Sequence, residues 1–389
     1  MATRTAMDDA LEQAVEAGRV PGVVAVAADS GGVTYQGAFG KRAANGDVPM
    51  TVDTVFWIAS MTKAITSVAA IQQVERGNLD LDAPIGEILP ELAAPRVLEG
   101  FDPAGVPILR RARRPITLRL LLTHTAGFTY NIWSEPMGRY MEHTGMPGII
   151  SCQNVCLEAP LMFDPGERWE YGINIDWAGK AVEKVTGLSL NEYFRQQIFE
   201  PLGMTDTGFV LGPDQRARLV SMHARTGETS FDVIPFEVPQ QPEFFMGGGG
   251  LYSTGRDYLT FLQALLNDGS FNGAQILKPE TVAEANRNQI GDLNVGLLRT
   301  ADPGSSLDAE FFPGAPKKWG LAYMINVEDA PTGRSAGSLA WAGLANTYYW
   351  LDPTNKVAGV ILTQILPFAD PIVLDLFGQF ERAVYGDRL

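Results

Sequence analysis

The stretch Thr54-Val55-Phe56-Trp57-Ile58-Ala59-Ser60-Met61-Thr62-Lys63 passes from a β-branched and aromatic segment into a helical pattern. Apolar residues at helical spacing follow it, namely Ala64, Ile65, Val68, Ile71 and Val74, and Gly77 is placed to end the helix. We therefore predict an extended segment over residues 54–58 and a helix over Ser60–Arg76. Ser60 stands at the junction between the two.

Ser60 and Lys63 form an S-x-x-K motif at this junction. Residues three apart lie on one helical face, with about 5–6 Å between their Cβ atoms, so Lys63 can reach the Ser60 hydroxyl. The helix N-terminus favours developing negative charge at Ser60, and a desolvated lysine there can act as a base near neutral pH. The motif fits a nucleophile with its base. A plain N-cap serine beside a solvated lysine fits it about equally well.

Helical and strand-like patterns alternate on both sides of this stretch. Before it we predict a helix over Asp8–Ala17 and a β-hairpin in which Val23–Ala28 turns at Gly31-Gly32 into a strand from Val33. The middle of the chain has helical runs separated by Pro/Gly loops, for example Leu118–Thr123, Ile175–Val185 and Asp257–Leu266. After about Pro316 four short strands are predicted, over 320–327, 337–344, 347–351 and 357–364, followed by a helix over Pro367–Tyr385.

Strands at both chain ends around a helical middle predict an α/β (α+β) fold. We expect one antiparallel sheet built from both termini and flanked by helices, with a second, mostly helical lobe. Residues 1–84 and 296–389 are assigned to the α/β domain and residues 85–295 to the mostly helical domain. A cleft between the two is the natural place for a ligand.

Composition restricts the classes of function. The 389 residues carry 30 Lys and Arg against 45 Asp and Glu, a formal charge of −15, which argues against nucleic acid as a partner. No stretch has the ~18 apolar residues of a membrane span, and the N-terminal residues lack the apolar core of a secretory signal. We therefore expect a cytoplasmic protein. Cys152 and Cys156 are expected to be buried thiols, and the three histidines lack metal-site spacing, so no metal or cofactor is expected.

A second serine motif competes with Ser60. Gly333-Arg334-Ser335-Ala336-Gly337 matches the G-x-S-x-G pentapeptide, which needs a strand before it, a helix after it and a histidine downstream. His124, His143 and His223 all precede Ser335, and the residues after it read as a strand. We interpret Ser335 as part of a turn between two strands.

Two further segments favour Ser60. Tyr171-Gly172-Ile173-Asn174 places a phenol and an amide on one loop, and Trp341-Ala342-Gly343-Leu344 lies on a predicted strand whose small residues let a substrate approach the backbone. A Ser-x-x-Lys motif, a Tyr and Asn loop and a (Lys or Trp)-x-Gly strand, in this order, resemble the serine β-lactamase and penicillin-binding protein superfamily. The sequence is most similar to class C β-lactamases and family VIII carboxylesterases.

The resemblance extends over nearly the whole chain. It includes Leu121-Leu122-Thr123-His124-Thr125-Ala126-Gly127, Pro201-Leu202-Gly203-Met204 and Gly247-Gly248-Gly249-Gly250-Leu251-Tyr252-Ser253. It implies a β-lactamase/transpeptidase-like fold and a Ser60 acyl-enzyme.

The resemblance also implies roles for individual residues. Lys63 and Tyr171 would share the work of the general base, and either could take the serine proton. The backbone N–H groups of Ser60 and Leu344 would form the oxyanion hole. Asn174 would position Lys63 or the substrate carbonyl, and Trp341 and Gly343 would border the substrate.

Trp341 departs from the β-lactamase pattern, which usually has Lys-Thr-Gly at this strand. An indole offers one N–H donor but no charge, so an anionic β-lactam would lose a charge-assisted contact while a neutral ester would lose nothing. We therefore expect a carboxylesterase acting on small-molecule esters. A β-lactamase, for which β-lactams would be the substrates, and a D-amino-acid peptidase or amidase are the alternatives. A catalytically silent binding protein on the same scaffold is a rival from another class.

Two other features have open interpretations. His124 is more readily explained as a satisfied polar group at a helix end than as a catalytic group. The aromatic stretch Phe128-Thr129-Tyr130-Asn131-Ile132-Trp133 could line an acyl or alcohol pocket or could simply pack in the core.

Overall fold

Seven antiparallel strands form one sheet in the computed structural model, which describes residues 2–386. Their order across the sheet is β11-β12-β13-β14-β15-β1-β2. The strands are β1 Gly22–Asp29, β2 Gly32–Gly40, β11 Lys317–Trp319, β12 Met324–Asn326, β13 Leu339–Gly343, β14 Thr347–Asp352 and β15 Val357–Leu362. The two ends of the chain meet where β1 pairs with β15, in a register that sets Val26 opposite Val360. The predicted sheet from both termini is confirmed.

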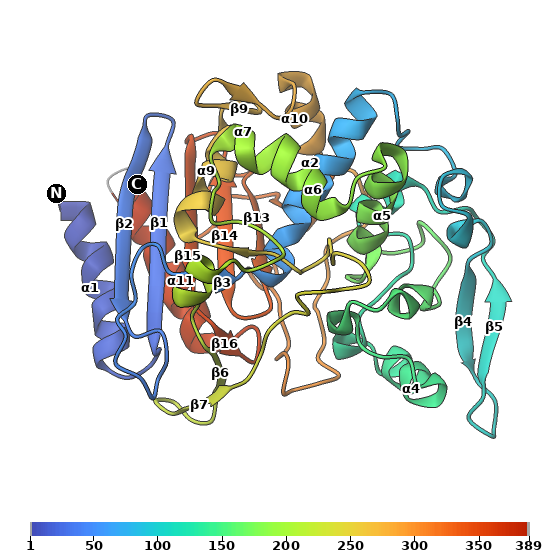
Figure 1. The fold of residues 1–389 in the computed structure, drawn as a ribbon, viewed down its shortest axis with the longest axis horizontal. Coiled ribbons are helices and arrows are strands. Elements are labelled where there is room, and N and C mark those ends of the chain that lie inside the picture. The colour runs from blue at the N-terminus through green and yellow to red at the C-terminus, as the bar shows by residue number, and fades with distance from the viewer. Residues whose placement is uncertain (1, 387–389) are drawn as a thin grey trace.

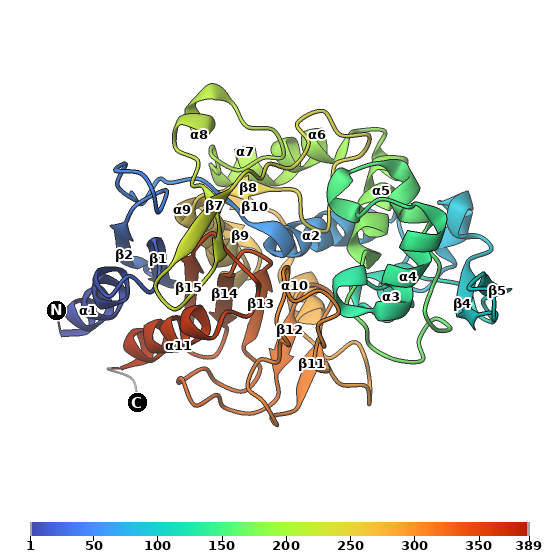
Figure 2. The same ribbon diagram turned by 90° about the horizontal axis from the view of Figure 1, so that it is seen from below.

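Helices cover both faces of this sheet (Figure 2). On one face lie α1, Ala2–Glu16, and α11, Pro371–Tyr385, where the rings of Phe377 and Phe380 pack on Trp350 of β14. On the other lies α9, Gly255–Leu266, whose Gly255 sits against Val24 and Val26 of β1, while α2, Thr62–Glu75, packs beside the sheet on α5, Asn174–Thr186. The sheet is therefore the centre of a three-layer α/β arrangement.

The helices of the middle of the chain lie beside the sheet (Figure 1). The longer ones are α4 Glu135–Thr144, α5 Asn174–Thr186 and α10 Pro279–Ala285. Shorter helices are α3 Leu118–Leu122, α6 Leu190–Phe194, α7 Glu200–Leu202 and α8 Pro213–Ala217. Strands outside the main sheet are β3 Phe56–Trp57, β4 Arg96–Phe101, β5 Pro107–Arg111, β6 Met222–Arg225, β7 Phe231–Ile234, β8 Tyr252–Ser253, β9 Ser270–Phe271, β10 Ala274–Gln275 and β16 Ile365–Leu366.

The structure differs from the sequence prediction in particular places. Of the strand expected over 320–327 only β12, Met324–Asn326, is present, and β11, which pairs with it, lies just before that range and was not predicted. The two strands are joined by a turn at Gly320, where a Cβ atom would meet the carbonyl oxygen of Ala285 at 2.3 Å. The hairpin β4–β5, at the far right in Figure 1, was not predicted. Helix α9 comes from the segment 85–295 yet packs on the sheet, and the division into two domains remains a prediction.

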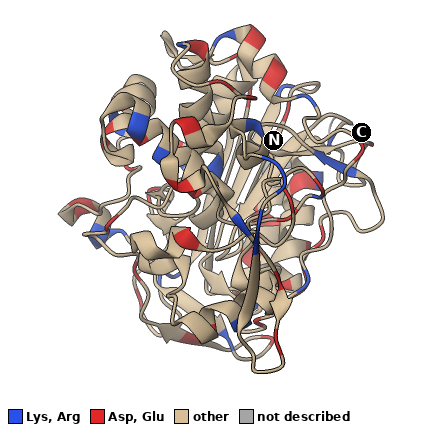
Figure 3. Cartoon of the chain, turned by 90° about the vertical axis from the view of Figure 1, so that its right-hand side faces the viewer, with Lys and Arg blue, Asp and Glu red and all other residues tan. Residues whose placement is uncertain are grey.

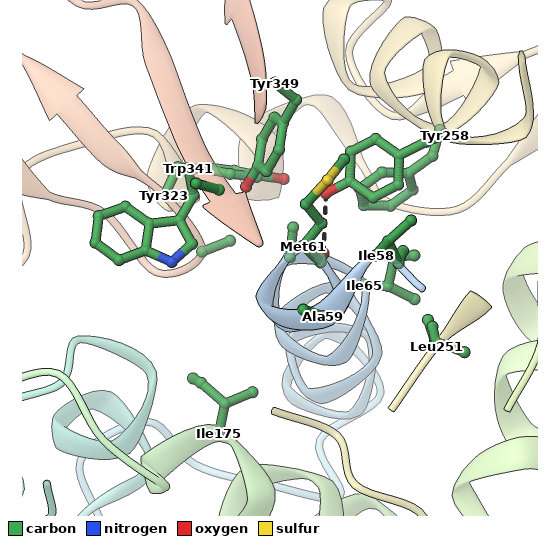
Figure 4. Packing of buried hydrophobic residues seen from close by; sticks show 14 of the residues in the cluster. Ile58, Ala59, Met61, Ile65, Ile175, Leu251, Tyr258, Tyr323, Trp341 and Tyr349 are labelled. Carbon is green, nitrogen blue, oxygen red and sulfur yellow. Dashed lines mark hydrogen bonds between the residues drawn. The ribbon is translucent and has the colours of Figure 1, made fainter. Parts of the chain in front are cut away.

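Ser60 lies in a 3₁₀ turn, Ala59–Met61, between β3 and α2. Figure 4 shows Ala59 and Met61 at the head of this helix, where the hydroxyl of Tyr258 donates to the Met61 carbonyl at 2.9 Å. Ala59 has a φ of +43°, a left-handed conformation that is strained for any residue with a Cβ atom. The turn before the serine is thus held in a strained shape by the elements packed around it.

Three expectations drawn from the composition can be compared with the structure: the distribution of charge, the absence of a membrane span and the state of the cysteines. Acidic and basic residues are interspersed on the side of the molecule in Figure 3. Among the residues that the structure describes, no helix is both long and apolar enough to span a membrane. Cys152 and Cys156 are buried and free, as predicted.

Candidate active site

Ser60 lines a cavity of about 380 Å³. Most of the wall is aromatic or aliphatic, formed by Trp57, Tyr130, Ile132, Trp133, Ile149, Ile150, Phe236, Met246, Leu344 and Leu366. Its polar side chains include Asn131 and the pair Asp302 and Ser305, in which Ser305 Oγ donates to Asp302 Oδ2 at 2.6 Å. The nucleophile candidate therefore faces a largely apolar space that can hold a small organic molecule.

Lys63 approaches Ser60 from one helical turn away. Its Nζ lies 3.1 Å from Ser60 Oγ and also contacts the Tyr130 hydroxyl at 2.9 Å and the Gly248 carbonyl at 2.5 Å. The three N–H groups of the ammonium match these three oxygens, and loss of one proton leaves Nζ a lone pair that can accept the proton of the Ser60 hydroxyl. The contact predicted from the spacing of the S-x-x-K motif is present.

Lys63 is 2% exposed, and burial controls its protonation. Loss of solvent lowers the pKa of the Lys63 ammonium, while the nearby carboxylate of Asp176 raises it and only partly offsets the effect of burial. Burial likewise raises the pKa of Asp176, against the attraction of Lys63. A lysine shifted in this direction can accept a proton at a lower pH than an exposed one.

Tyr171, like Lys63, is hydrogen-bonded to Ser60. Its hydroxyl shares a hydrogen bond with Ser60 and accepts one from Trp341 Nε1 at 2.9 Å, and Lys63 Nζ lies 4.7 Å from the centre of its ring. Burial raises the pKa of the Tyr171 phenol, and the hydrogen bonds from Ser60 and Trp341 only partly offset that effect. Tyr171 is therefore a neutral hydrogen-bonding group near neutral pH, placed to pass a proton.

Tyr130 is a further candidate residue that the motifs did not identify. It comes from the aromatic stretch 128–133, and the structure divides that stretch between the two open interpretations. Residues 130–133 line the cavity, whereas Phe128 is buried in the core. The hydroxyl of Tyr130 reaches Lys63 across 67 residues of sequence, and no local pattern reports such a contact.

Strand β13 brings the predicted Trp-x-Gly segment to the site, and only part of it borders the cavity. Leu344, directly after the strand, lines the cavity with Ser60. Trp341 is buried and contacts Tyr171. At Gly343 a Cβ atom would lie 2.3 Å from both the Ile58 carbonyl oxygen and Thr347 Oγ1. Gly343 thus lets the strand press against the turn that carries Ser60, and Trp341 acts on the site through Tyr171.

Asn174 is not placed at Lys63. It is fully buried, and its Nδ2 contacts His124 Nδ1 at 3.0 Å and the Phe128 carbonyl oxygen at 3.4 Å. The physical reason is its position: it opens helix α5 and stands three residues after Tyr171, so its side chain points to a different neighbour. The Oδ1 atom of Asn174 is buried with no hydrogen-bond partner among the described residues, and its expected role toward Lys63 or the substrate carbonyl stays a prediction.

His124 supports Tyr171. Its ring packs 4.7 Å from the Tyr171 ring centre and edge-on to Trp319, and burial lowers its pKa well below the ordinary value. The residue is therefore a neutral imidazole in the wall behind the phenol. The expectation of a fully satisfied polar group is met only in part, because Nδ1 contacts Asn174 whereas Nε2 is buried with no hydrogen-bond partner among the described residues.

Ser335 lies in the turn between β12 and β13, as interpreted from the sequence. Its backbone N–H donates to Asp352 Oδ2 at 2.9 Å and its Oγ accepts from Asn355 Nδ2 at 2.7 Å. These contacts fix the turn. In the described residues no lysine, histidine or tyrosine is hydrogen-bonded to its hydroxyl.

Comparisons with known proteins identify the family of the chain. The profile of the family described as Beta-lactamase matches residues 7–378. Monacolin J acid methylbutanoyltransferase of Aspergillus terreus is 35% identical, over 98% of this chain and 95% of its own length. Lovastatin esterase of Penicillium rubens is 34% identical, over 97% of this chain and 98% of its own. The solved structure of simvastatin synthase (LovD) from Aspergillus terreus superimposes with a TM-score of 0.86 at 32% identity, covering 100% of this chain and 99% of that one.

Proposed function

Since the chain belongs to the Beta-lactamase family, as its motifs predicted, we propose that it is a serine carboxylesterase that acts through a Ser60 acyl-enzyme. The family contains serine acyltransferases and hydrolases that act on esters. Relatives named as an esterase and as an acyltransferase both match almost the whole chain.

The contact of 3.1 Å between Ser60 Oγ and Lys63 Nζ, beside a cavity of about 380 Å³, carries the proposal. It supplies a nucleophile, a base and room for a reactant in one place, which are the requirements of nucleophilic catalysis. A catalytically silent binding protein would have no need of a buried lysine against a serine hydroxyl.

In the proposed mechanism Lys63 takes the proton of the Ser60 hydroxyl, and Oγ attacks the ester carbonyl carbon. The tetrahedral intermediate collapses with cleavage of the bond to the alcohol oxygen, and that oxygen receives the proton held by Lys63, relayed by Tyr171. Water then attacks the acyl-enzyme with the same base. The acid leaves and the proton returns to Ser60.

The proposed oxyanion hole consists of the backbone N–H groups of Ser60 and Leu344. Both residues line the cavity, and the close approach at Gly343 brings the end of β13 against the nucleophile's turn. One such donor typically contributes about 3–4 kcal/mol to transition-state stabilisation.

The lining of the cavity favours neutral esters with apolar groups. Among the described residues that line it, none is Lys or Arg and one, Asp302, is a carboxylate. An anionic substrate would therefore lose its solvation without gaining an ion pair. This is the basis on which we propose esters above β-lactams as substrates.

Acyl transfer to an alcohol is a second candidate. The observation that favours it is the relative named as a methylbutanoyltransferase, which is 35% identical over 98% of this chain. The same acyl-enzyme serves both reactions, and the outcome depends on whether water or an alcohol reaches it. Formation of a new ester when a primary alcohol is added to the assay would favour transfer, whereas release of free acid alone would favour hydrolysis.

The test replaces each candidate serine in turn. Ser60→Ala should lower kcat/KM on a short p-nitrophenyl ester by about 10⁴-fold or more and abolish labelling by a fluorophosphonate probe, because the nucleophile is lost. The matched control Ser335→Ala should keep both. Retained turnover or labelling in Ser60→Ala would refute the proposal.

A further inference from the structure

Asp176 is a buried carboxylate behind the catalytic lysine. It is the third residue of helix α5, it is 2% exposed, and its Oδ1 accepts a hydrogen bond from the Gly248 backbone N–H at 2.8 Å. Its Oδ2 is buried with no hydrogen-bond partner among the described residues. A buried carboxylate that is only half satisfied is costly, so its presence calls for a compensating role.

Gly248 links this carboxylate to Lys63. The Gly248 N–H donates to Asp176, and the Gly248 carbonyl accepts from Lys63 Nζ at 2.5 Å. A Cβ atom at this position would lie 2.4 Å from Asp176 Oδ2, so only glycine allows the approach. Thr66, one turn after Lys63, holds the neighbouring carbonyl of Gly247 at 2.6 Å. The glycine segment is thus clamped between α2 and α5.

We propose that Asp176 is a positioning residue for Lys63: it fixes the Gly248 carbonyl that holds the amine against Ser60, and its negative charge sets how readily the amine gives up its proton. The inference rests on the proposed function, in which Lys63 is the general base. The inference gives the glycine segment 247–250 a role that the sequence alone did not indicate: its Gly248 carbonyl holds the Lys63 amine.

The titratable groups around Lys63 make the sign of the effect clear. The groups that face it or Asp176 are Tyr130, Tyr171, His124 and Cys152. Burial raises the pKa of the two phenols and of the thiol and lowers that of His124, so all four are neutral near pH 7. Asp176 is therefore the group whose charge stabilises the Lys63 ammonium, and removing that charge should lower the pKa of Lys63 further.

The experiment compares Asp176→Asn with Asp176→Ala. Asparagine keeps an acceptor for the Gly248 N–H but removes the charge, so the acid limb of kcat/KM should move to lower pH while the plateau stays within about threefold of the unmodified protein. Alanine also removes the acceptor, so the plateau kcat should fall by about 10- to 100-fold, as expected when a catalytic group is misplaced. The ratio of the plateau kcat of Asp176→Asn to that of Asp176→Ala measures how much the hydrogen bond to the Gly248 N–H contributes to positioning Lys63.

Asp257→Asn is the matched control. Asp257 is also the third residue of a helix, α9, is 7% exposed and accepts a backbone N–H at 2.8 Å from Asp206, but it has no contact with Lys63. This variant should leave the pH profile unchanged. Each rate is normalised to the folded fraction from thermal unfolding, so that loss of stability is separated from loss of positioning.

The rate of fluorophosphonate labelling of Ser60 against pH is the second readout, since it needs no natural substrate. An unchanged acid limb in Asp176→Asn, by either readout, would overturn the inference, and so would an equal fall of activity in Asp257→Asn. If Asp176→Ala does not fold, the position of the acid limb in the pH profile of Asp176→Asn alone tests the inference. The proposed function fails separately, through turnover or labelling that survives Ser60→Ala.

Discussion

Ser60 and Ser335 both stand in short motifs used by catalytic serines, and both side chains are half-buried. Around Ser335 the structure places groups that fix a turn, with Asn355 bonded to the hydroxyl and Asp352 bonded to the backbone N–H. Around Ser60 it places a buried amine, a buried phenol and a cavity. A serine motif thus becomes a candidate site only when other segments of the chain bring a base and a cavity to it.

Removing Lys63, the proposed base beside Ser60 and absent from Ser335, should have the greatest effect on activity. Lys63→Met should lower kcat/KM on a short p-nitrophenyl ester by about 10³-fold, because Ser60 would lose its proton acceptor. The matched control is Lys317→Met: Lys317 is a lysine only 3% exposed whose Nζ is bonded to Glu310 and to the carbonyls of Phe312 and Ala315. Activity per folded molecule that falls equally in both variants would contradict the assignment of Lys63.

The pH dependence sharpens the comparison by identifying the base. Burial lowers the pKa of Lys63 below its ordinary 10.5 and raises that of Tyr171 above its ordinary 10.0. If the neutral amine is the base, kcat/KM rises with pH along a limb that ends well below 10.5, and loses about tenfold per pH unit below it. A limb that lies above pH 10 would instead assign the role to the Tyr171 phenolate.

A smaller effect is expected in the preference of the Ser60 cavity for neutral over anionic substrates. Without a cationic side chain in its lining, the site lacks a charge-assisted contact worth about 1.5–3 kcal/mol to an anionic cephalosporin. We expect kcat/KM on a neutral p-nitrophenyl ester to exceed that on a chromogenic cephalosporin by about 10- to 100-fold on that account. A preference for the cephalosporin would show that the interpretation of Trp341 is wrong.

The smallest effect belongs to Ser335. Ser335→Ala removes one acceptor of the Asn355 amide, which also donates to Asp352, and should lower the free energy of unfolding by about 1 kcal/mol, measured by urea denaturation. Its kcat/KM should stay that of the unmodified protein.

The features predicted correctly from the sequence are contacts between residues close in the chain and strands recognised by their apolar pattern. The contact between Ser60 and Lys63 follows from their spacing of three on one helix, and the sheet follows from strand patterns at both chain ends. Contacts between residues that are distant in the chain could not be predicted from the sequence. The bond of Tyr130 to Lys63 joins segments with no shared motif, and the link from Asp176 to Lys63 passes through the backbone of Gly248.

The role expected of Asn174 stays a prediction. Its side chain contacts His124 and the Phe128 carbonyl oxygen, 50 and 46 residues away in the sequence, and no local pattern reports such partners. The strand missed at 317–319 and the hairpin β4–β5 are short or rich in arginine, so neither shows the apolar alternation by which strands are predicted.

The pairing of β1 with β15 has a consequence for how the chain acquires its shape. Strand β1 can pair with β2 as soon as both are made, but its other edge is completed only by β15, the last strand of the sheet along the chain, so that edge stays open through most of synthesis. Such distant pairing slows folding and exposes sticky intermediates, and a nascent chain truncated before residue 357 should depend on chaperones to remain unaggregated.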